Sequence, residues 1–314
     1  MRILVTGVTG QVGHDLLAAL APLGEVVGVD RAQMDLASAD SIRATVRQVG
    51  PSLIFNPAAY TAVDRAESEQ ELAMQVNGVA PGVLAEEAAR IGAALVHYST
   101  DYVFDGSKRC AYTETDPTAP LGVYGRTKLA GEQAIAAAGC RHLILRTSWV
   151  YSLRGRNFLT TMHRLACERD ELRVVDDQHG APTTSTEIAR ASAALAARWL
   201  GTGARDAAAG DAPADGVYHM TCAGSTTWCG FARAIVERLP AVAAALGGPP
   251  PRHRPTVTGI ATAQYPTPAR RPANSVLDNA KLRAASGVAL LAWEDALDAL
   301  LAARQVVSPR AAAT

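Results

Sequence analysis

Short apolar segments rich in β-branched residues alternate with longer Ala- and Leu-rich segments over the first half of the chain. The short ones read "RILVTG", "EVVGVD", "SLIFNPAAY", "AALVHYST" and "RHLILRTSWVY". Between them, "DLLAALAPLG", "ELAMQVNGVAPGVLAEEAARIG" and "KLAGEQAIAAAG" have the apolar spacing of helices. Near-continuous apolar strands are typical of a sheet covered on both faces, and their alternation with helices favours parallel βαβ units. The sequence therefore predicts an α/β fold with a doubly wound parallel sheet.

The alternation loosens after Tyr151, where helical and loop-like segments are mixed. We expect a smaller α/β substrate-binding region there, lying beside the carboxyl edge of the sheet. The segment 201–216, rich in Gly, Ala and Asp, predicts a surface loop. We expect the sheet domain to comprise residues 1–152 and 183–222. The substrate-binding region is expected to comprise residues 153–182 and 223–305, and residues 306–314 are expected to form a tail.

Composition excludes several classes of protein. Lys+Arg and Asp+Glu both number 30, so no net positive charge indicates a nucleic-acid partner. No segment approaches the ~20 apolar residues of a membrane span, and the N-terminal apolar run is too short for a signal peptide. The five cysteines are scattered without a CxxC pair, which indicates neither a zinc site nor a redox pair. We expect a cytoplasmic protein without membrane or nucleic-acid partners and without a protein-built metal site.

Three glycines follow the first predicted strand at the spacing GxxGxxG: Gly7, Gly10 and Gly13. Glycines at a strand–helix turn let backbone N–H groups approach a pyrophosphate, and the helix that follows presents its positive end to it. The alternative is a plain strand–turn–helix without a ligand. Because the motif lies at the first strand, we interpret the sheet as a Rossmann-type, dinucleotide-binding domain.

The end of the second predicted strand bears on the choice of cofactor. Asp30 lies about 20 residues beyond the glycines, where an acid binds the ribose hydroxyls of an adenosine and favours NADH. Arg31, the next residue, would instead hold a 2′-phosphate and favour NADPH. Asp35 and Leu36 follow as neighbours of the adenine. The sequence leaves the choice between NADH and NADPH open.

A tyrosine and a lysine, Tyr124 and Lys128, lie four positions apart in "VYGRTKLAGE". On a helix they share one face, and we expect the lysine to lower the pKa of the tyrosine so that it serves as a proton donor. The alternative is an exposed surface helix. Two flanking strands end in "HYSTDYVF" and "RTSWVY" and place Thr100, Asp101 and Trp149 at the same sheet edge. This convergence favours a catalytic pair.

The strand–turn GxxGxxG, the strand-end Ser/Thr and Tyr-x-x-x-Lys resemble the extended short-chain dehydrogenase/reductase superfamily. Longer strings, in order along residues 1–300, are similar to the dTDP-4-dehydrorhamnose reductase family: "AYTAVDRAE", "HYSTDYVFDG", "YGRTKLAGE", "DDQHGAPT" and "RRPANSVLD". The resemblance implies reduction of the C4 ketone of dTDP-4-dehydro-L-rhamnose by NADPH or NADH, in dTDP-rhamnose synthesis. It also implies a homodimer, and magnesium in some relatives.

The resemblance also implies residue roles. Tyr124 would donate the proton, Lys128 would activate it and hold the nicotinamide ribose, and Thr100 would hydrogen-bond the sugar carbonyl. With the residues argued above, the expected cofactor contacts are Gly7, Gly10, Gln11, Val12, Asp30, Arg31, Asp35, Leu36, Ala59, Tyr60, Thr61, Tyr124 and Lys128. The expected substrate contacts are Thr100, Asp101, Trp149 and Arg271.

Several alternatives stay open. Arg271 would grip the substrate pyrophosphate or form a structural ion pair, and Trp149 would stack on the substrate or pack in the core. Pro57 departs from the family pattern and is expected to shift the end of its strand. Another nucleotide-sugar epimerase or dehydratase would share the glycines, Tyr124 and Lys128, although no glutamate follows Asp101. A catalytically silent, cofactor-binding regulatory subunit is the other alternative.

Overall fold

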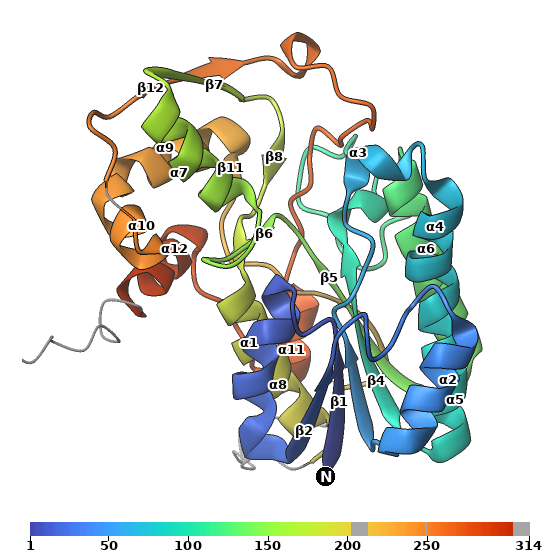
Figure 1. Ribbon diagram of the computed structural model, residues 1–314. Helices are drawn as coiled ribbons and strands as arrows, with labels where there is room; N and C mark the ends of the chain where they lie inside the picture. The colour runs from blue at the N-terminus through green and yellow to red at the C-terminus, as the bar shows by residue number, and fades with distance from the viewer. Residues whose placement is uncertain (202–212, 249, 304–314) are drawn as a thin grey trace, which may run out of the picture.

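The computed structural model describes residues 1–201, 213–248 and 250–303 (Figure 1). Most of the expected surface loop 201–216 and the whole expected tail 306–314 lie outside the described residues.

Six parallel strands form the central sheet in the order β10-β5-β4-β3-β1-β2. Their bounds are β1 Arg2–Thr6, β2 Glu25–Val29, β3 Leu53–Asn56, β4 Ala94–Thr100, β5 Arg141–Thr147 and β10 Gly216–His219. The chain leaves β1 toward β2 on one side and returns to β3 on the other. The carboxyl ends of β1 and β3 are therefore the topological switch point, where open α/β sheets bind ligands. The predicted doubly wound parallel sheet is confirmed.

Helices cover both faces of the sheet (Figure 1). One face packs on α1 (Gln11–Leu20), α8 (Ser185–Trp199) and α11 (Ala280–Ser286), through residues such as Leu16, Ile188 and Leu282. The other face packs on α2 (Ala39–Val49), α5 (Ala80–Ile91) and α6 (Val123–Ala137). All residues of β3 and β4 are buried, which explains why apolar residues predominate in both strands; the polar residues Asn56, His97, Ser99 and Thr100 lie toward their carboxyl ends.

A second hydrophobic cluster lies beyond the carboxyl ends of the strands, among the helices drawn on the left of Figure 1. Its helices are α7 (Phe158–Glu168), α9 (Trp228–Glu237), α10 (Leu239–Leu246) and α12 (Trp293–Ala303). Three two-stranded sheets accompany them: β6 (Val150–Tyr151) with β9 (Thr183–Thr184), β7 (Glu171–Val175) with β12 (Thr256–Ile260), and β8 (His179–Gly180) with β11 (Thr226–Thr227). The domain boundaries remain a prediction. Leu282 and Leu290, within the range assigned to the substrate-binding region, pack in the cluster of the central sheet.

Short helical segments complete the chain, and one of them is irregular. They are η1 (Ala21–Leu23), α3 (Val63–Ala66), α4 (Gln70–Met74), η3 (Asp101–Val103) and η4 (Thr262–Gln264). Between α4 and α5, residues Gln75–Val79 form the π-helical turn η2. Its Asn77 accepts a hydrogen bond from Tyr60 N (2.8 Å) and donates one to Tyr60 O (3.0 Å). The irregular turn thus ties this helical segment to the loop after β3. None of the helices that the structure describes has the length and apolar character of a membrane span.

Candidate active site

Two adjoining cavities of about 300 and 440 Å³ run along the carboxyl edge of the sheet at the switch point, and both are lined by Gly7, Thr9, Ala58 and Ala59. Gly7 has a φ of +58°. A Cβ on Gly13 would lie 2.3 Å from Gly7 O. Only glycine therefore allows this turn to close against the start of α1.

The start of α1 fits a pyrophosphate. Gly10 is the N-cap of the helix, and no side chain caps the backbone there, so the positive helix end faces the cavity lined by Gly10, Gln11 and Val12. Gln11 is held in place because its Oε1 accepts hydrogen bonds from Ser152 Oγ (2.9 Å) and Asn157 Nδ2 (3.0 Å). The cradle and the elongated cavity fit a dinucleotide cofactor.

The smaller cavity is the adenosine end of this arrangement. It is lined by the predicted Asp30, Arg31, Asp35 and Leu36. Asp30 Oδ1 accepts hydrogen bonds from the backbone N–H of Ala32 and Gln33, which orients the carboxylate. The exposed Arg31 lies 3.8 Å from Asp35 in an ion pair. Both the acid and the cation are therefore present, and the geometry is compatible with either cofactor.

The loop after β3 divides between the two cavities. Tyr60 lines the smaller one and Thr61 the larger one, with Ala59 in both. Tyr60 also donates a hydrogen bond to Glu69 (2.6 Å), which raises the pKa of the phenol. Pro57 lines the larger cavity directly after Asn56, where β3 ends, as expected for a residue that cannot donate to a strand ladder.

Tyr124 and Lys128 lie on one helix, α6, and both line the larger cavity. The structure thus brings the predicted pair to the glycine cradle. The Lys128 side chain is buried, and its Nζ lies 2.6 Å from Tyr98 O and 2.9 Å from His97 Nε2. Burial lowers the pKa of Lys128 to about 7, although Glu132 on the next turn opposes the shift.

The expectation that Lys128 lowers the pKa of Tyr124 is wrong for this structure. Burial, and next the charge of Asp101, raise the pKa of Tyr124 to about 12, against a smaller effect of the Thr100 side chain. Lys128 does not lower the pKa of the phenol because its Nζ is hydrogen-bonded to His97 and Tyr98 on β4. Tyr124 is therefore held as a neutral phenol, which is the form that donates a proton.

Thr100 and Asp101 are buried at the end of β4, as predicted. Thr100 Oγ1 donates to Asp101 Oδ1 (2.9 Å) and accepts from Tyr102 N (3.2 Å), which begins the short helix η3. Burial raises the pKa of Asp101 to about 6, against the hydrogen bonds that it accepts. These hydrogen bonds therefore fix the Thr100 hydroxyl, which lies beside the phenol of Tyr124.

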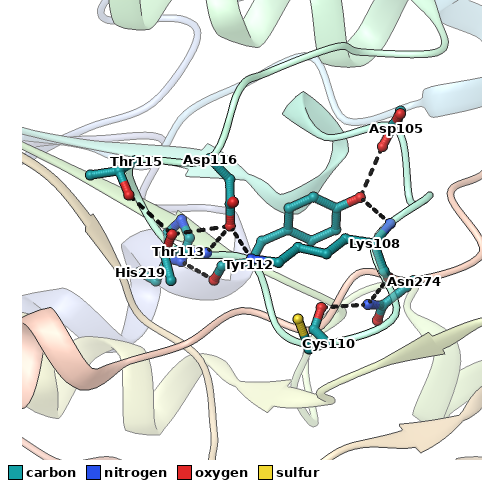
Figure 2. A network of polar contacts seen from close by, with 9 residues as sticks. All are labelled: Asp105, Lys108, Cys110, Tyr112, Thr113, Thr115, Asp116, His219 and Asn274. Atoms are coloured by element: carbon teal, nitrogen blue, oxygen red, sulfur yellow. Dashed lines mark hydrogen bonds and ion pairs between the residues drawn. The ribbon is translucent and has the colours of Figure 1, made fainter.

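The loop that follows η3 is fixed by a polar network (Figure 2). Tyr112 donates its hydroxyl to Asp105 (2.9 Å), and Lys108 pairs with Asp116. Asn274, from the "RRPANSVLD" segment, donates to the carbonyls of Lys108 (2.7 Å) and Cys110 (3.0 Å). The late segment therefore clamps the loop that leads away from Thr100 and Asp101.

Trp149 has a φ of +46°, which is unusual for a bulky residue. Its ring stacks on Trp228 with centroids 3.6 Å apart and planes at 10°. Gly180 leaves room for the ring, because a Cβ there would lie 2.4 Å from Trp149 Cε2. Trp149 is half-buried, so the stack fixes one face of the indole, and its substrate role stays a prediction.

Arg271 forms a two-pronged ion pair with Asp64, with Nη1 and Nη2 at 2.7 and 2.8 Å from the two carboxylate oxygens. Nη1 also donates to Thr267 Oγ1 and Ala269 O. This is the structural arrangement that the sequence left as one of two alternatives. Binding of a pyrophosphate by Arg271 would require these contacts to rearrange.

Two cations that sequence reasoning missed, Arg154 and Arg156, line the larger cavity beside Gly10 and Gln11. They lie in the loop after β6, and the sequence signal was the basic string "SLRGRN", which follows a strand that ends at the sheet edge. Arginine suits the recognition of phosphate groups. Over residues 1–201, 213–248 and 250–303, no three metal-ligating side chains come together.

Comparison with known proteins agrees with this geometry. A sequence model of the RmlD substrate binding domain family matches residues 1–306. The dTDP-4-dehydrorhamnose reductase of Burkholderia thailandensis is 50% identical over 297 residues, which cover 95% of this chain and 97% of that protein. The dTDP-4-dehydrorhamnose reductase of Escherichia coli K12 is 42% identical over 300 residues, covering 94% and 95%.

Solved structures give the same result. A dTDP-4-dehydrorhamnose reductase of Clostridium acetobutylicum superposes with a TM-score of 0.85 at 34% identity, covering 97% of this chain and 100% of that one. The Bacillus anthracis dTDP-4-dehydrorhamnose reductase, in complex with NADP, superposes with a TM-score of 0.83 at 31% identity, covering 96% and 99%. With a family model and relatives that span nearly the whole chain, this protein belongs to the RmlD substrate binding domain family.

Proposed function

We propose that this chain reduces the C4 ketone of dTDP-4-dehydro-L-rhamnose to the alcohol, with NADPH or NADH as the source of hydride. The observation that carries the proposal is the position of Tyr124 and Lys128, which line the same cavity as the glycine cradle. The relatives named for this reaction, at 42–50% identity, support the same substrate.

The roles of the side chains follow from their surroundings. A ketone that accepts hydride becomes an alkoxide, which is costly in a poorly solvated pocket without a proton source. Tyr124, held as a neutral phenol, donates that proton, and Thr100 orients the sugar oxygen. Gly10, Gln11 and Val12 would hold the pyrophosphate of the coenzyme, with Arg154 and Arg156 nearby, and the coenzyme would supply the hydride.

Two further properties belong to the proposal. A cytoplasmic location is compatible with the lack of a membrane-spanning helix among the described residues. A homodimer is expected from the family resemblance, and light scattering of the purified protein measures it. Magnesium stays an expectation of the resemblance alone.

The alternative function is that of a silent cofactor-binding subunit. Tyr124 and Lys128 line one cavity and the Thr100 side chain lies beside the Tyr124 phenol, an arrangement that favours an enzyme instead. The decisive experiment incubates the purified chain with NADPH or NADH and dTDP-4-dehydro-L-rhamnose and follows oxidation of the coenzyme. Oxidation that depends on the sugar nucleotide, with dTDP-L-rhamnose as product, supports the reductase. Tight coenzyme binding without oxidation would support the regulatory subunit.

A further inference from the structure

A glutamate from a distant part of the chain lies at the start of the helix that carries Tyr124. Glu67, directly after the short helix α3, accepts a hydrogen bond through its Oε1 from the backbone N–H of Val123 (2.8 Å). Val123 is the first residue of α6 and Tyr124 is the second. The side chain of Glu67 therefore connects the segment that follows β3 with the helix of the proposed proton donor, 56 positions further along the chain.

The start of α6 depends on a cap from outside the helix. The first backbone N–H groups of a helix have no acceptor within it, and in α6 an intrahelical bond begins with Arg126 N, which donates to Gly122 O (3.1 Å). Gly122 is the N-cap residue and has no side chain that could satisfy the earlier groups, as Ser, Thr, Asp or Asn usually does. Glu67 supplies the missing acceptor for Val123, and its carboxylate also suits the positive end of the helix.

Two glycines let this first turn be held closely from two sides. A Cβ on Gly122 would lie 2.7 Å from Glu67 Oε1, so the glycine leaves the space that the carboxylate occupies. A Cβ on Gly125 would lie 2.1 Å from Tyr102 O. The same turn of α6 thus packs directly against the backbone of η3, which follows the end of β4.

The packing around the cap extends to the phenol. Val123 is 3% exposed and lies in a small apolar cluster with Ala66 of α3 and Ala73 of α4, and Tyr124 packs against the same cluster. The Tyr124 ring also meets the ring of Tyr102 edge-on, with centroids 5.8 Å apart and planes at 83°. A displacement of Val123 would therefore be transmitted to the neighbouring tyrosine.

We propose that Glu67 is a positioning residue that acts through Tyr124: by capping Val123 it keeps the first turn of α6 wound, and it thereby fixes the phenol at the cavity that the glycine cradle also lines. Helix ends fray, so a residue in the first turn depends on the cap more than a residue further along. Lys128 lies one turn later, and its Nζ is held by two hydrogen bonds to β4. Loss of the cap should therefore displace the tyrosine and leave the lysine in place.

The consequence for turnover rests on the proposed function. Proton donation requires the phenol to lie within hydrogen-bond reach of the ketone oxygen, and a misplacement of about 1 Å costs on the order of 10²-fold in rate. We expect Glu67→Ala to lower kcat by roughly 10–10²-fold and to leave the dissociation constant of NADP⁺ little changed, because the glycine cradle is untouched. Glu67→Gln should restore most of kcat, since its amide oxygen still accepts a hydrogen bond.

The first test is hydrogen exchange of the Val123 amide, followed by NMR on the full chain. Exchange should be slow in the wild type and in Glu67→Gln, and fast in Glu67→Ala. The matched control is Asp278→Ala, because Asp278 Oδ1 accepts from the N–H of Ala280 (2.7 Å), the first residue of α11. This control removes the same kind of cap from another helix and should leave Val123 protected. Slow exchange of Val123 in Glu67→Ala would overturn the proposal, and this readout does not depend on turnover.

The second test distinguishes an effect through Tyr124 from a general effect on the fold. The free energy of unfolding and kcat are measured for Glu67→Ala, for Asp278→Ala, and for Glu67→Ala combined with Tyr124→Phe. Both single variants should lose stability, because each removes a helix cap, and only Glu67→Ala should lower kcat. When the hydroxyl is already absent in Tyr124→Phe, adding Glu67→Ala should lower kcat by less than about twofold, since groups that act as a unit are not additive.

Three outcomes of the kinetics would show that Glu67 does not act through Tyr124. They are equal falls of kcat with and without the tyrosine hydroxyl, equal falls in Glu67→Ala and Asp278→Ala, and a Glu67→Gln variant as slow as Glu67→Ala. If the chain does not turn over this sugar nucleotide, the proposed function fails. The exchange of the Val123 amide then still decides whether Glu67 holds the first turn of α6.

Discussion

Arg146 donates two hydrogen bonds to Glu132, from Nε and Nη2 at 2.9 and 2.7 Å from the two carboxylate oxygens. Both side chains are buried, with 5% of each exposed. We expect Glu132→Gln to lower the free energy of unfolding by about 3–5 kcal/mol, because it leaves a buried guanidinium without its counter-charge. Urea denaturation measures the loss. The control is Glu168→Gln, which breaks the exposed pair with Arg164 and should cost less than about 1 kcal/mol. Equal losses in the two variants would contradict the buried pair.

Tyr124→Phe removes the hydroxyl that we assign as the proton donor. We expect turnover to fall by roughly 10²–10⁴-fold, the usual contribution of one general acid. Coenzyme affinity should change little, because the glycine cradle is untouched. Steady-state kinetics and coenzyme titration measure the two quantities. Tyr265→Phe, at an exposed tyrosine, is the control, and unchanged turnover in Tyr124→Phe would refute the assignment.

Lys128 makes stability depend on pH. Its pKa is about 7 in the folded chain against 10.5 for the free side chain. Between these values the unfolded chain holds one proton more, so the free energy of unfolding rises with pH in this window. Below about pH 7 both states are protonated and the buried ammonium costs its full amount.

The comparison with Lys128→Met isolates this contribution. The wild type should gain on the variant by at most about 1.4 kcal/mol per pH unit as the pH rises from neutrality toward 10.5. Urea denaturation at a series of pH values measures the difference. Parallel curves for the two proteins would mean that the lysine has an ordinary pKa. The variant should also lose turnover and coenzyme affinity.

Gly180→Ala tests the position of Trp149. The added methyl would lie 2.4 Å from the indole, so the ring must leave its stack on Trp228. We expect a higher KM for the sugar nucleotide with coenzyme affinity unchanged, and a stability loss of about 1–3 kcal/mol from overpacking. Gly248→Ala, where the nearest heavy atom is 4.0 Å away, is the control. An unchanged KM would place Trp149 outside the substrate site.

The architecture of the sheet could be predicted because buried parallel strands and covering helices have distinct periodicities. Each apolar run quoted for the first half became a strand of the central sheet, and the glycines, Tyr124 and Lys128 were found at its carboxyl edge. The pairing of β7 with β12 could not be predicted, because strands separated by about 80 residues share no local sequence pattern that indicates their pairing.

The electrostatics of the site were harder to foresee than its location. A four-residue spacing predicts that Tyr124 and Lys128 share a helix face, but it does not show that β4 supplies nearer partners for the lysine. From the sequence alone, His97 is a polar residue within a largely apolar predicted strand, and nothing indicates its partners. Only the register of β3 and β4 sets it beside Asn56.

The π-helical turn η2 makes the length of its segment as important as its composition. A π turn carries one more residue than an α turn. Deleting one residue from this turn would rotate the following helix, α5, by roughly 100° about the helix axis. Either Asn77 would then swing away from the loop after β3, or α5 would expose its apolar side. Substitutions should therefore be better tolerated in this segment than insertions or deletions.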